Sequence, residues 1–136
     1  MKKVFITGAT GFIGASLARE LLEQGCEVKA LVRPGSIKAN LAGLPIELHE
    51  GDLLDQDSLE QGLAGCDTLY HAAADYRLWT RNPKSMYDVN VGGTRSVLEA
   101  ALKRNLSRVV YTSSVGTLGN PGDGTPGTED TPVSFD

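Results

Sequence analysis

The chain has 136 residues, of which 40% are hydrophobic and 22% are charged, and its formal net charge is −4. This length fits one globular domain of about 100–200 residues. An acidic chain without a basic cluster is a poor candidate for binding nucleic acid. No apolar run approaches the roughly 20 residues needed to span a bilayer, and the N-terminus lacks the long apolar region of a signal peptide. We therefore expect a cytoplasmic protein with no transmembrane segment.

Strands and helices alternate in the first half of the sequence. Residues 3–7 form a β-rich run, and apolar residues then recur every four positions over 12–23, as in an amphipathic helix whose face includes Ile13. Pro34 and Gly35 break the chain after the second strand. The expected elements are strands over 27–32 and 46–49, a weak segment over 40–44 between them, and a short helix capped by Asp57 or Ser58.

The same alternation continues in the second half. A strand is expected over 67–71, a long helix from Pro83 to about Asn105, and a strand over 107–112. The inner face of that helix is predicted to carry Met86, Asn90, Gly93, Val97 and Ala101. No helical periodicity follows, and residues 119–136 are dense in turn residues, which indicates an extended loop or tail.

Strands separated by helices indicate a parallel sheet built from βαβ units with right-handed crossovers. We predict a Rossmann-type α/β fold, a doubly wound parallel sheet of order 3-2-1-4-5 with helices on both faces. Residues 1–118 would form this domain, and residues 119–136 the Gly/Pro-rich loop or tail. Cys26 and Cys66 each precede an expected strand and form no CxxC motif, so we interpret both as small buried side chains and expect no metal site.

A glycine motif, TGATGFIG, joins the first strand to the first helix over residues 7–14. In this context Gly8 would allow a tight turn, Gly11 a close approach of the backbone to a pyrophosphate, and Gly14 close packing of helix and sheet. The N-terminus of the helix would add unpaired N–H groups. A phosphate-binding P-loop would need a lysine directly after the last glycine, and none is present. The motif predicts a dinucleotide site, against the alternative that the glycines serve only the turn.

Arg33 ends the second strand, where an NAD-specific site would place Asp or Glu. A guanidinium attracts a 2′-phosphate that a carboxylate would repel, so the sequence favours NADP over NAD. Ser36 and Lys38 could assist. The alternative is a solvent-facing arginine at the end of a strand.

Further polar residues follow the third and fourth strands, at the edge where doubly wound sheets bind ligands. Asp52 could accept from an adenine amino group or could cap its own turn. His71 is more readily explained as a packed, hydrogen-bonding residue than as a catalytic base. Ala72, Ala73 and Ala74 after it leave room for a flat ligand.

Two polar sites lie further along the chain. Asn90 falls on the inner helix face, where a buried amide needs partners, and we expect it to tie the helix to nearby strand ends or to a water chain. Ser113 and Ser114 end the fifth strand, where they could hold a substrate oxygen or satisfy the backbone. No GxSxG motif surrounds them.

The motifs TGATGFIG, GDLLD, YHAAA, DVNVGGT and VVYTSSVGTLG resemble those of the extended short-chain dehydrogenase/reductase family. Within it, the chain is similar to the NAD-dependent epimerase/dehydratases and the dihydroflavonol reductase-like enzymes. The runs HAAADYRLW and DGTPGTEDTPVS are most similar to hopanoid-associated sugar epimerases. The predicted cofactor-binding residues are Gly8, Thr10, Gly11, Phe12, Ile13, Gly14, Arg33, Asp52, Leu53, Ala72 and Ala73.

The resemblance also implies the catalytic residues. Ser114 would hold the substrate oxygen, Asn90 would organise the active site, and residues 76–79 would border the substrate pocket. The family's catalytic Tyr is followed by Lys four residues later, and none of the four tyrosines here has that neighbour. In the family this Tyr exchanges a proton while the Lys lowers its pKa.

We therefore expect the NADP(H)-binding portion of a larger reductase or epimerase, ending before the sixth strand and inactive by itself. Its substrate would be a small molecule with a carbonyl or hydroxyl group, sugar-like or a lipid-linked polyol. The resemblance allows a homodimer of the full-length protein. The alternative is a non-catalytic dinucleotide-binding module that acts as a redox sensor or a partner subunit.

Overall fold

The computed structural model describes residues 2–133. Five parallel strands form one sheet in the order β3-β2-β1-β4-β5, which confirms the predicted fold class and strand order. The register places Phe5 beside Lys29 on one side and beside Leu69 on the other. The strands are β1 (Lys3–Thr7), β2 (Glu27–Val32), β3 (Glu47–Glu50), β4 (Thr68–His71) and β5 (Arg108–Tyr111).

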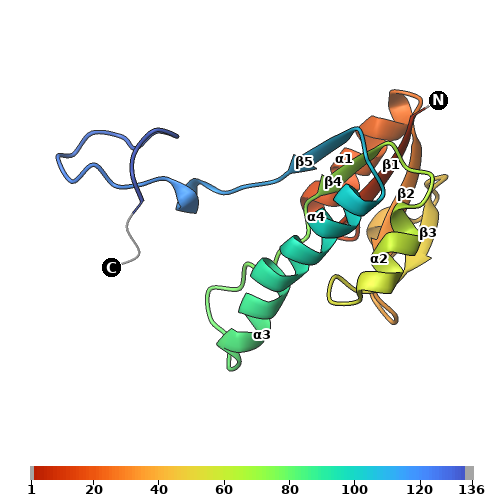
Figure 1. Cartoon of the computed structure of the whole chain (residues 1–136), viewed down its shortest axis with the longest axis horizontal. Helices are drawn as coiled ribbons and strands as arrows, with labels where there is room; N and C mark the ends of the chain where they lie inside the picture. The colour runs from red at the N-terminus through yellow and green to blue at the C-terminus, as the bar shows by residue number, and fades with distance from the viewer. Residues whose placement is uncertain (1, 134–136) are drawn as a thin grey trace.

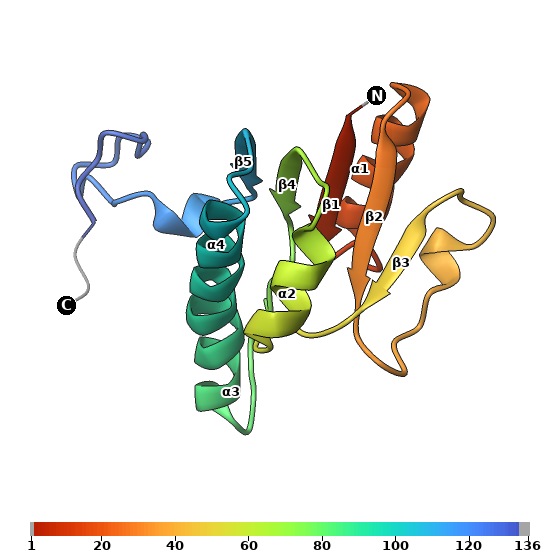
Figure 2. The same cartoon turned by 45° about the vertical axis from the view of Figure 1, so that its right-hand side comes forward.

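Helices cover both faces of the sheet, as Figure 2 shows. On one face lies α1 (Phe12–Glu23), and on the other lie α2 (Gln56–Leu63) and α4 (Thr94–Lys103). The shorter elements are η1 (Ala39–Leu41), α3 (Pro83–Tyr87), the π-helical turn η2 (Asp88–Gly93) and η3 (Val115–Thr117). Among the described residues, no helix has both the length and the apolar character needed to cross a membrane.

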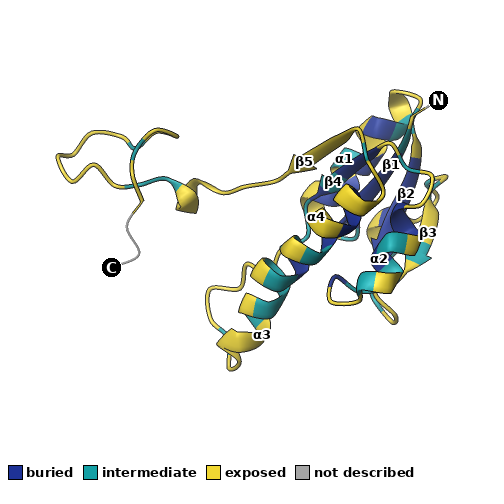
Figure 3. Cartoon of the chain, viewed as in Figure 1, coloured by how far each residue is buried: buried dark blue, intermediate teal, exposed yellow. Residues whose placement is uncertain are grey.

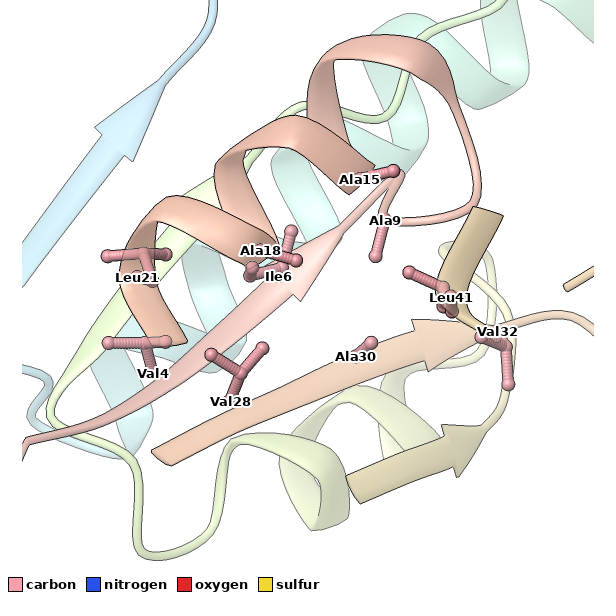
Figure 4. Close-up of a cluster of buried hydrophobic side chains, with 10 residues drawn as sticks. All are labelled: Val4, Ile6, Ala9, Ala15, Ala18, Leu21, Val28, Ala30, Val32 and Leu41. Carbon is pink, nitrogen blue, oxygen red and sulfur yellow. The ribbon is translucent and has the colours of Figure 1, made fainter. Parts of the chain in front are cut away.

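Side chains that alternate along the strands pack into two separate cores, one on each face of the sheet. Val4 and Ile6 of β1 face α1 and pack with Ala15, Ala18 and Leu21 of that helix (Figure 4). The opposite face of the sheet packs against α2 and α4 through Phe5, Leu31, Leu59, Leu63, Leu69, Val97, Ala100 and Ala101. The alanines of α1 bring that helix close to the strands, since they add little width to the interface.

Several helix boundaries differ from those expected. Helix α2 begins at Gln56 because Asp55, and not Asp57 or Ser58, caps it by accepting from the Ser58 amide at 3.2 Å. The long helix begins at Pro83 as expected and ends at Lys103, but it contains the π-helical turn η2. Strand β3 starts one residue later than expected, and the weak segment before it holds η1.

The burial of some side chains also corrects the sequence prediction. Ile13 is 59% exposed, because the buried face of α1 begins at Gly14 and Ala15. Cys26 and Cys66 are free thiols that are only half-buried, and burial raises the pKa of the Cys66 thiol. No group of three metal-binding side chains occurs within residues 2–133.

The chain becomes exposed from β5 onward. Every residue of β5 is exposed, and the segment after it extends away from the sheet (Figures 1 and 3). A short helical turn, η3, interrupts this segment. The expected loop or tail over 119–136 contains turns and no helix or strand as far as residue 133, and its residues 134–136 lie outside the described residues.

Candidate dinucleotide site

A cavity of about 540 Å³ opens at the carboxyl ends of the strands. Its walls come from the glycine turn after β1, the ends of β2 and β3, and the loop after β4. This is the edge where doubly wound sheets bind their ligands. Eight of the predicted cofactor residues line it: Gly8, Thr10, Gly11, Arg33, Asp52, Leu53, Ala72 and Ala73.

The glycine turn is shaped by close backbone contacts. Gly8 has φ +76°, and a Cβ there would lie 2.7 Å from the backbone nitrogen of Ala73. A Cβ on Gly14 would lie 2.1 Å from the carbonyl oxygen of Gly8, so helix α1 rests directly on the turn. Larger side chains at either position would move the turn away from the end of β4. Gly8 and Gly14 therefore hold the cavity wall in place.

The N-terminus of α1 faces this turn without a side-chain cap. Its N-cap is Gly11, whose carbonyl accepts from the Ala15 amide at 3.0 Å. The amides of the first helical turn have no partner within an α-helix, and together with the helix dipole they favour an anion. Phe12 and Ile13 do not line the cavity, and their side chains are 85% and 59% exposed. Their role in cofactor binding stays a prediction.

Arg33 and Asp52 line the cavity from the segments that follow β2 and β3. Arg33 is exposed directly after β2. Asp52 Oδ1 accepts from the Leu54 amide at 2.8 Å, so this carboxylate does cap its own turn. No hydrogen bond between described residues engages its second oxygen, which leaves an acceptor for a ligand amino group. Both interpretations of Asp52 are therefore compatible with its geometry.

His71 joins three parts of the fold through a buried polar network. The ring is 1% exposed, with Nδ1 2.6 Å from Thr7 Oγ1 and Nε2 2.9 Å from Thr94 Oγ1. Thr7 Oγ1 also accepts from the Ala73 amide at 3.3 Å. If the Thr7 hydroxyl donates its proton to Nδ1, the neutral ring carries its own proton on Nε2 and donates it to Thr94. Tyr111 stacks on the ring with centroids 5.2 Å apart.

Burial lowers the pKa of His71 to about 4. The imidazole is therefore neutral near pH 7, and both of its nitrogens are engaged. This supports the interpretation of His71 as a packed, hydrogen-bonding residue. It ties the end of β1 to the end of β4 and to the start of α4.

Asn90 clamps the loop that follows β4. Its Oδ1 accepts from the Asp75 amide, and its Nδ2 donates to the Asp75 carbonyl, both at 2.7 Å. This pair confirms that Asn90 ties the helix to residues after a strand end. The clamp lies in the π-helical turn η2, a type of irregularity often found at functional sites. The role of Asn90 in catalysis stays a prediction.

An ion pair stands on the clamped loop. Arg77 Nε donates to Asp75 Oδ1 at 2.8 Å, and Arg77 Nη2 pairs with Asp75 Oδ2. The Arg77 guanidinium holds the pKa of the Asp75 carboxyl below its usual value, and Arg33 contributes to the same shift. Both members of the pair line the cavity.

The two serines after β5 are not brought to the cavity. Ser114 is exposed and caps η3 by accepting from the Gly116 amide at 3.1 Å. Ser113 Oγ lies 3.5 Å from Thr117 Oγ1. Neither serine is among the residues that line the cavity. In this structure they serve the local backbone, and the catalytic role of Ser114 stays a prediction.

Sequence reasoning did not single out some residues of the cavity wall. Leu31, Asp75 and Val89 all line it. Leu31 could have been found from the strand alternation, and Val89 from its place next to Asn90. Nothing in the local pattern around Asp75 indicates that its backbone pairs with an amide 15 positions later. Tyr76 and Arg77 border the cavity, whereas Leu78 and Trp79 do not line it and are exposed.

Comparisons with known proteins agree with this geometry. The model of the NAD dependent epimerase/dehydratase family matches residues 4–135. A Synechocystis sp. protein, provisionally named dihydroflavonol 4-reductase, is 52% identical over 120 residues, which cover 88% of this chain and 35% of that protein.

Solved structures give the same picture. The crystal structure of gox2253 superposes with a TM-score of 0.91 and 47% identity, over 98% of this chain and 41% of that one. The Bordetella bronchiseptica enzyme WbmH in complex with NAD+ superposes with a TM-score of 0.73 and 33% identity, over 82% of this chain and 38% of that one. The chain thus spans about a third of the Synechocystis protein and about two fifths of these two structures.

Proposed function

This chain belongs to the NAD dependent epimerase/dehydratase family, and from that premise we propose that it holds NADP(H) for hydride transfer to or from a small molecule. The observation that carries the proposal is the single cavity that joins the glycine turn to Arg33 and Asp52. The substrate would present a carbonyl or hydroxyl group on a sugar-like or lipid-linked polyol. A bound nicotinamide cofactor would supply or accept the hydride.

The residues present fit a dinucleotide along the length of the cavity. The glycine turn offers backbone N–H groups where a Cβ would collide, which suits the pyrophosphate. Asp52 retains an oxygen for an adenine amino group, and Leu53 beside it is a buried apolar wall. Ala72 and Ala73 keep the end of β4 narrow, so that the nicotinamide half can cross the sheet edge.

Arg33 supports a preference for NADP. It lines the cavity at the end of β2, where an acidic residue would select the 2′-hydroxyl of NAD. The test is a titration of the chain with NADPH and NADH before and after Arg33→Ala. We expect the wild type to bind NADPH more tightly and the variant to lose that preference. An unchanged ratio of the two affinities would remove the NADP assignment.

The chain by itself should bind the cofactor without turnover. None of its tyrosines is followed by lysine four residues later, so the proton-exchanging pair of the family is missing from these residues. Measurable reductase or epimerase activity of the 136-residue chain would contradict this expectation. The same absence suits a non-catalytic dinucleotide-binding module. The gene sequence beyond residue 136 would distinguish the two: a downstream YxxxK indicates the enzyme, and its lack indicates the binding module. We further propose that the protein is cytoplasmic and that the full-length enzyme forms a homodimer.

A further inference from the structure

Two arginines line the cavity, and the proposed function uses only one of them. Arg33 follows β2, and Arg77 lies in the loop after β4. The side chain of Arg77 is 61% exposed. Its guanidinium is engaged by the carboxylate of Asp75, two residues earlier. The cavity therefore holds a cation that is neutralised by the protein itself.

Asp75 lies within electrostatic reach of both arginines. The hydrogen bonds from Arg77 are the larger cause of its lowered pKa, and the charge of Arg33 adds to them. The Asp75 carboxylate thus pairs with the Arg77 guanidinium and also experiences the charge of Arg33, which follows a different strand. An anion with more oxygens could engage both groups at once.

The two partners of the ion pair differ in freedom. The Asp75 backbone is fixed on both sides by Asn90, and its side chain is only 16% exposed. Within residues 2–133, the Arg77 guanidinium contacts no acceptor other than Asp75. The Asp75 carboxylate also accepts from the Arg77 amide at 3.3 Å, a contact that survives when the guanidinium swings away. Arg77 is therefore the member that can change partner.

We propose that Arg77 is a second specificity-determining residue for the cofactor. When NADP(H) binds, the Arg77 guanidinium leaves Asp75 and joins Arg33 on the ribose 2′-phosphate. This inference rests on the proposed NADP(H) site. A phosphate monoester offers three acceptor oxygens, enough for two guanidinium groups, and such charge-assisted bonds are strong. With NADH, which presents a hydroxyl there, Arg77 stays on Asp75. Asp75 thus occupies the place of the phosphate until NADP(H) binds.

The first test compares Arg77→Met with Arg81→Met. Arg81 lies in the same loop and is exposed, but it does not line the cavity, so this control makes the same change in charge. NADPH and NADH affinities are measured on the 136-residue chain by titration of nicotinamide fluorescence at fixed salt. We expect Arg77→Met to weaken NADPH about tenfold, as for a lost bond to a charged group. NADH should stay within about twofold, and Arg81→Met should match the wild type.

The second test removes the competing carboxylate. In Asp75→Asn the amide oxygen can still accept from the Arg77 amide, and the Asn90 clamp is untouched because it binds only the backbone. We expect the NADPH affinity to rise several-fold while the NADH affinity stays unchanged. A rise for both cofactors would indicate a general effect of charge and would overturn the assignment to the 2′-phosphate.

The outcomes separate this inference from the function on which it rests. Equal losses of NADPH and NADH in Arg77→Met, or no loss of either, overturn the inference. A third outcome is that the wild type prefers NADPH, that Arg33→Ala removes this preference, and that Arg77→Met does not remove it. In that case the proposed function stands and the inference fails. If the folded wild type binds neither cofactor, both are overturned.

Discussion

Strands β4 and β5 lie side by side in the sheet with Leu69 paired to Val109, yet their environments differ sharply. Leu69 is fully buried, whereas Val109 is 41% exposed. Both strands carry apolar side chains, but β4 has β1 on its other side, and β5 is an edge strand. A parallel strand is buried by the layers and neighbours around it, and its own sequence does not decide this.

The same division separates the candidate functions. The glycine turn, Arg33 and Asp52 follow β1, β2 and β3 and share one cavity. Ser114 follows the exposed strand and lines no part of that cavity. The part of the molecule that would hold the cofactor is thus formed within residues 2–133, and the surroundings of the serine are open.

The largest effect should come from Gly14→Ala, on the covered side. Its Cβ would lie 2.1 Å from the Gly8 carbonyl oxygen, so the helix or the turn must move. We expect a loss of more than about 3 kcal/mol in the free energy of unfolding, and no NADPH binding. The measurement is urea denaturation together with a cofactor titration.

Gly92→Ala is the matched control within a helix. A Cβ there meets only Leu54 Cδ2, at 3.9 Å, so this change should stabilise the helix by up to about 1 kcal/mol. A Gly14→Ala variant with wild-type stability and affinity would contradict the role assigned to the glycine turn.

Truncating the paired residues of β4 and β5 tests the comparison directly. Leu69→Ala removes a fully buried side chain from the core, at a cost of about 3–4 kcal/mol. Val109→Ala acts on a partly exposed side chain and should cost less than about 1 kcal/mol. Equal losses in denaturant titrations would show that β5 is covered in solution.

The buried histidine makes stability depend on pH. Its pKa in the fold is about 4, below the 6.5 of an exposed histidine, so the unfolded chain binds the proton more readily between these values. Stability from this group is therefore complete above pH 6.5, falls by on the order of 3 kcal/mol as the pH drops from 6.5 to 4, and levels off below that. The measurement is the unfolding free energy at intervals from pH 7 to 4.

A His71→Asn variant is the control for this effect. It has no imidazole to protonate, so it should lose less stability on acidification than the wild type. It should also be less stable at pH 7, because it lacks the buried ring that bonds Thr7 and Thr94. Parallel pH curves for the two proteins would show that another group causes the acid sensitivity.

The smallest effect is expected from Ser114→Ala. Ser114 caps a short helical turn outside the cavity, so the NADPH affinity should stay within about twofold of the wild type. The same titration is the measurement. A large loss of affinity would place the serine at the cofactor in solution. It would also reduce the contrast between the cavity and the segment that follows β5.

Much of the covered region follows from local patterns. The alternation of strands and helices gave the parallel order, and the strand–turn–helix context of TGATGFIG located the wall of the cavity. Arg33 and Asp52 were found because strand ends converge at one edge of a parallel sheet. These features are encoded by short spacings that a sequence displays directly.

Other features depend on the path of the chain in space. The spacing of Asn90 placed it on the inner helix face, but its partner, Asp75, depends on how the loop folds back. Ile13 fits a helical repeat and is nonetheless exposed. The repeat could not predict this, since it does not reveal where the neighbouring strand ends. The exposure of β5 likewise depends on its place at the edge of the sheet, which its own apolar residues do not indicate.

The wide turn η2 has a consequence for how the chain tolerates changes in length. A π-helical turn amounts to one residue more than an α-helix needs. Deleting Gly92 would let the helix become regular, but each residue turns an α-helix by about 100°, so Asn90 would rotate away from Asp75 relative to α4. The placement of the loop at the cavity is therefore set by the number of residues in a helix. Loss of one residue in η2 would misplace the loop around Asp75, although the loop's own sequence is unchanged.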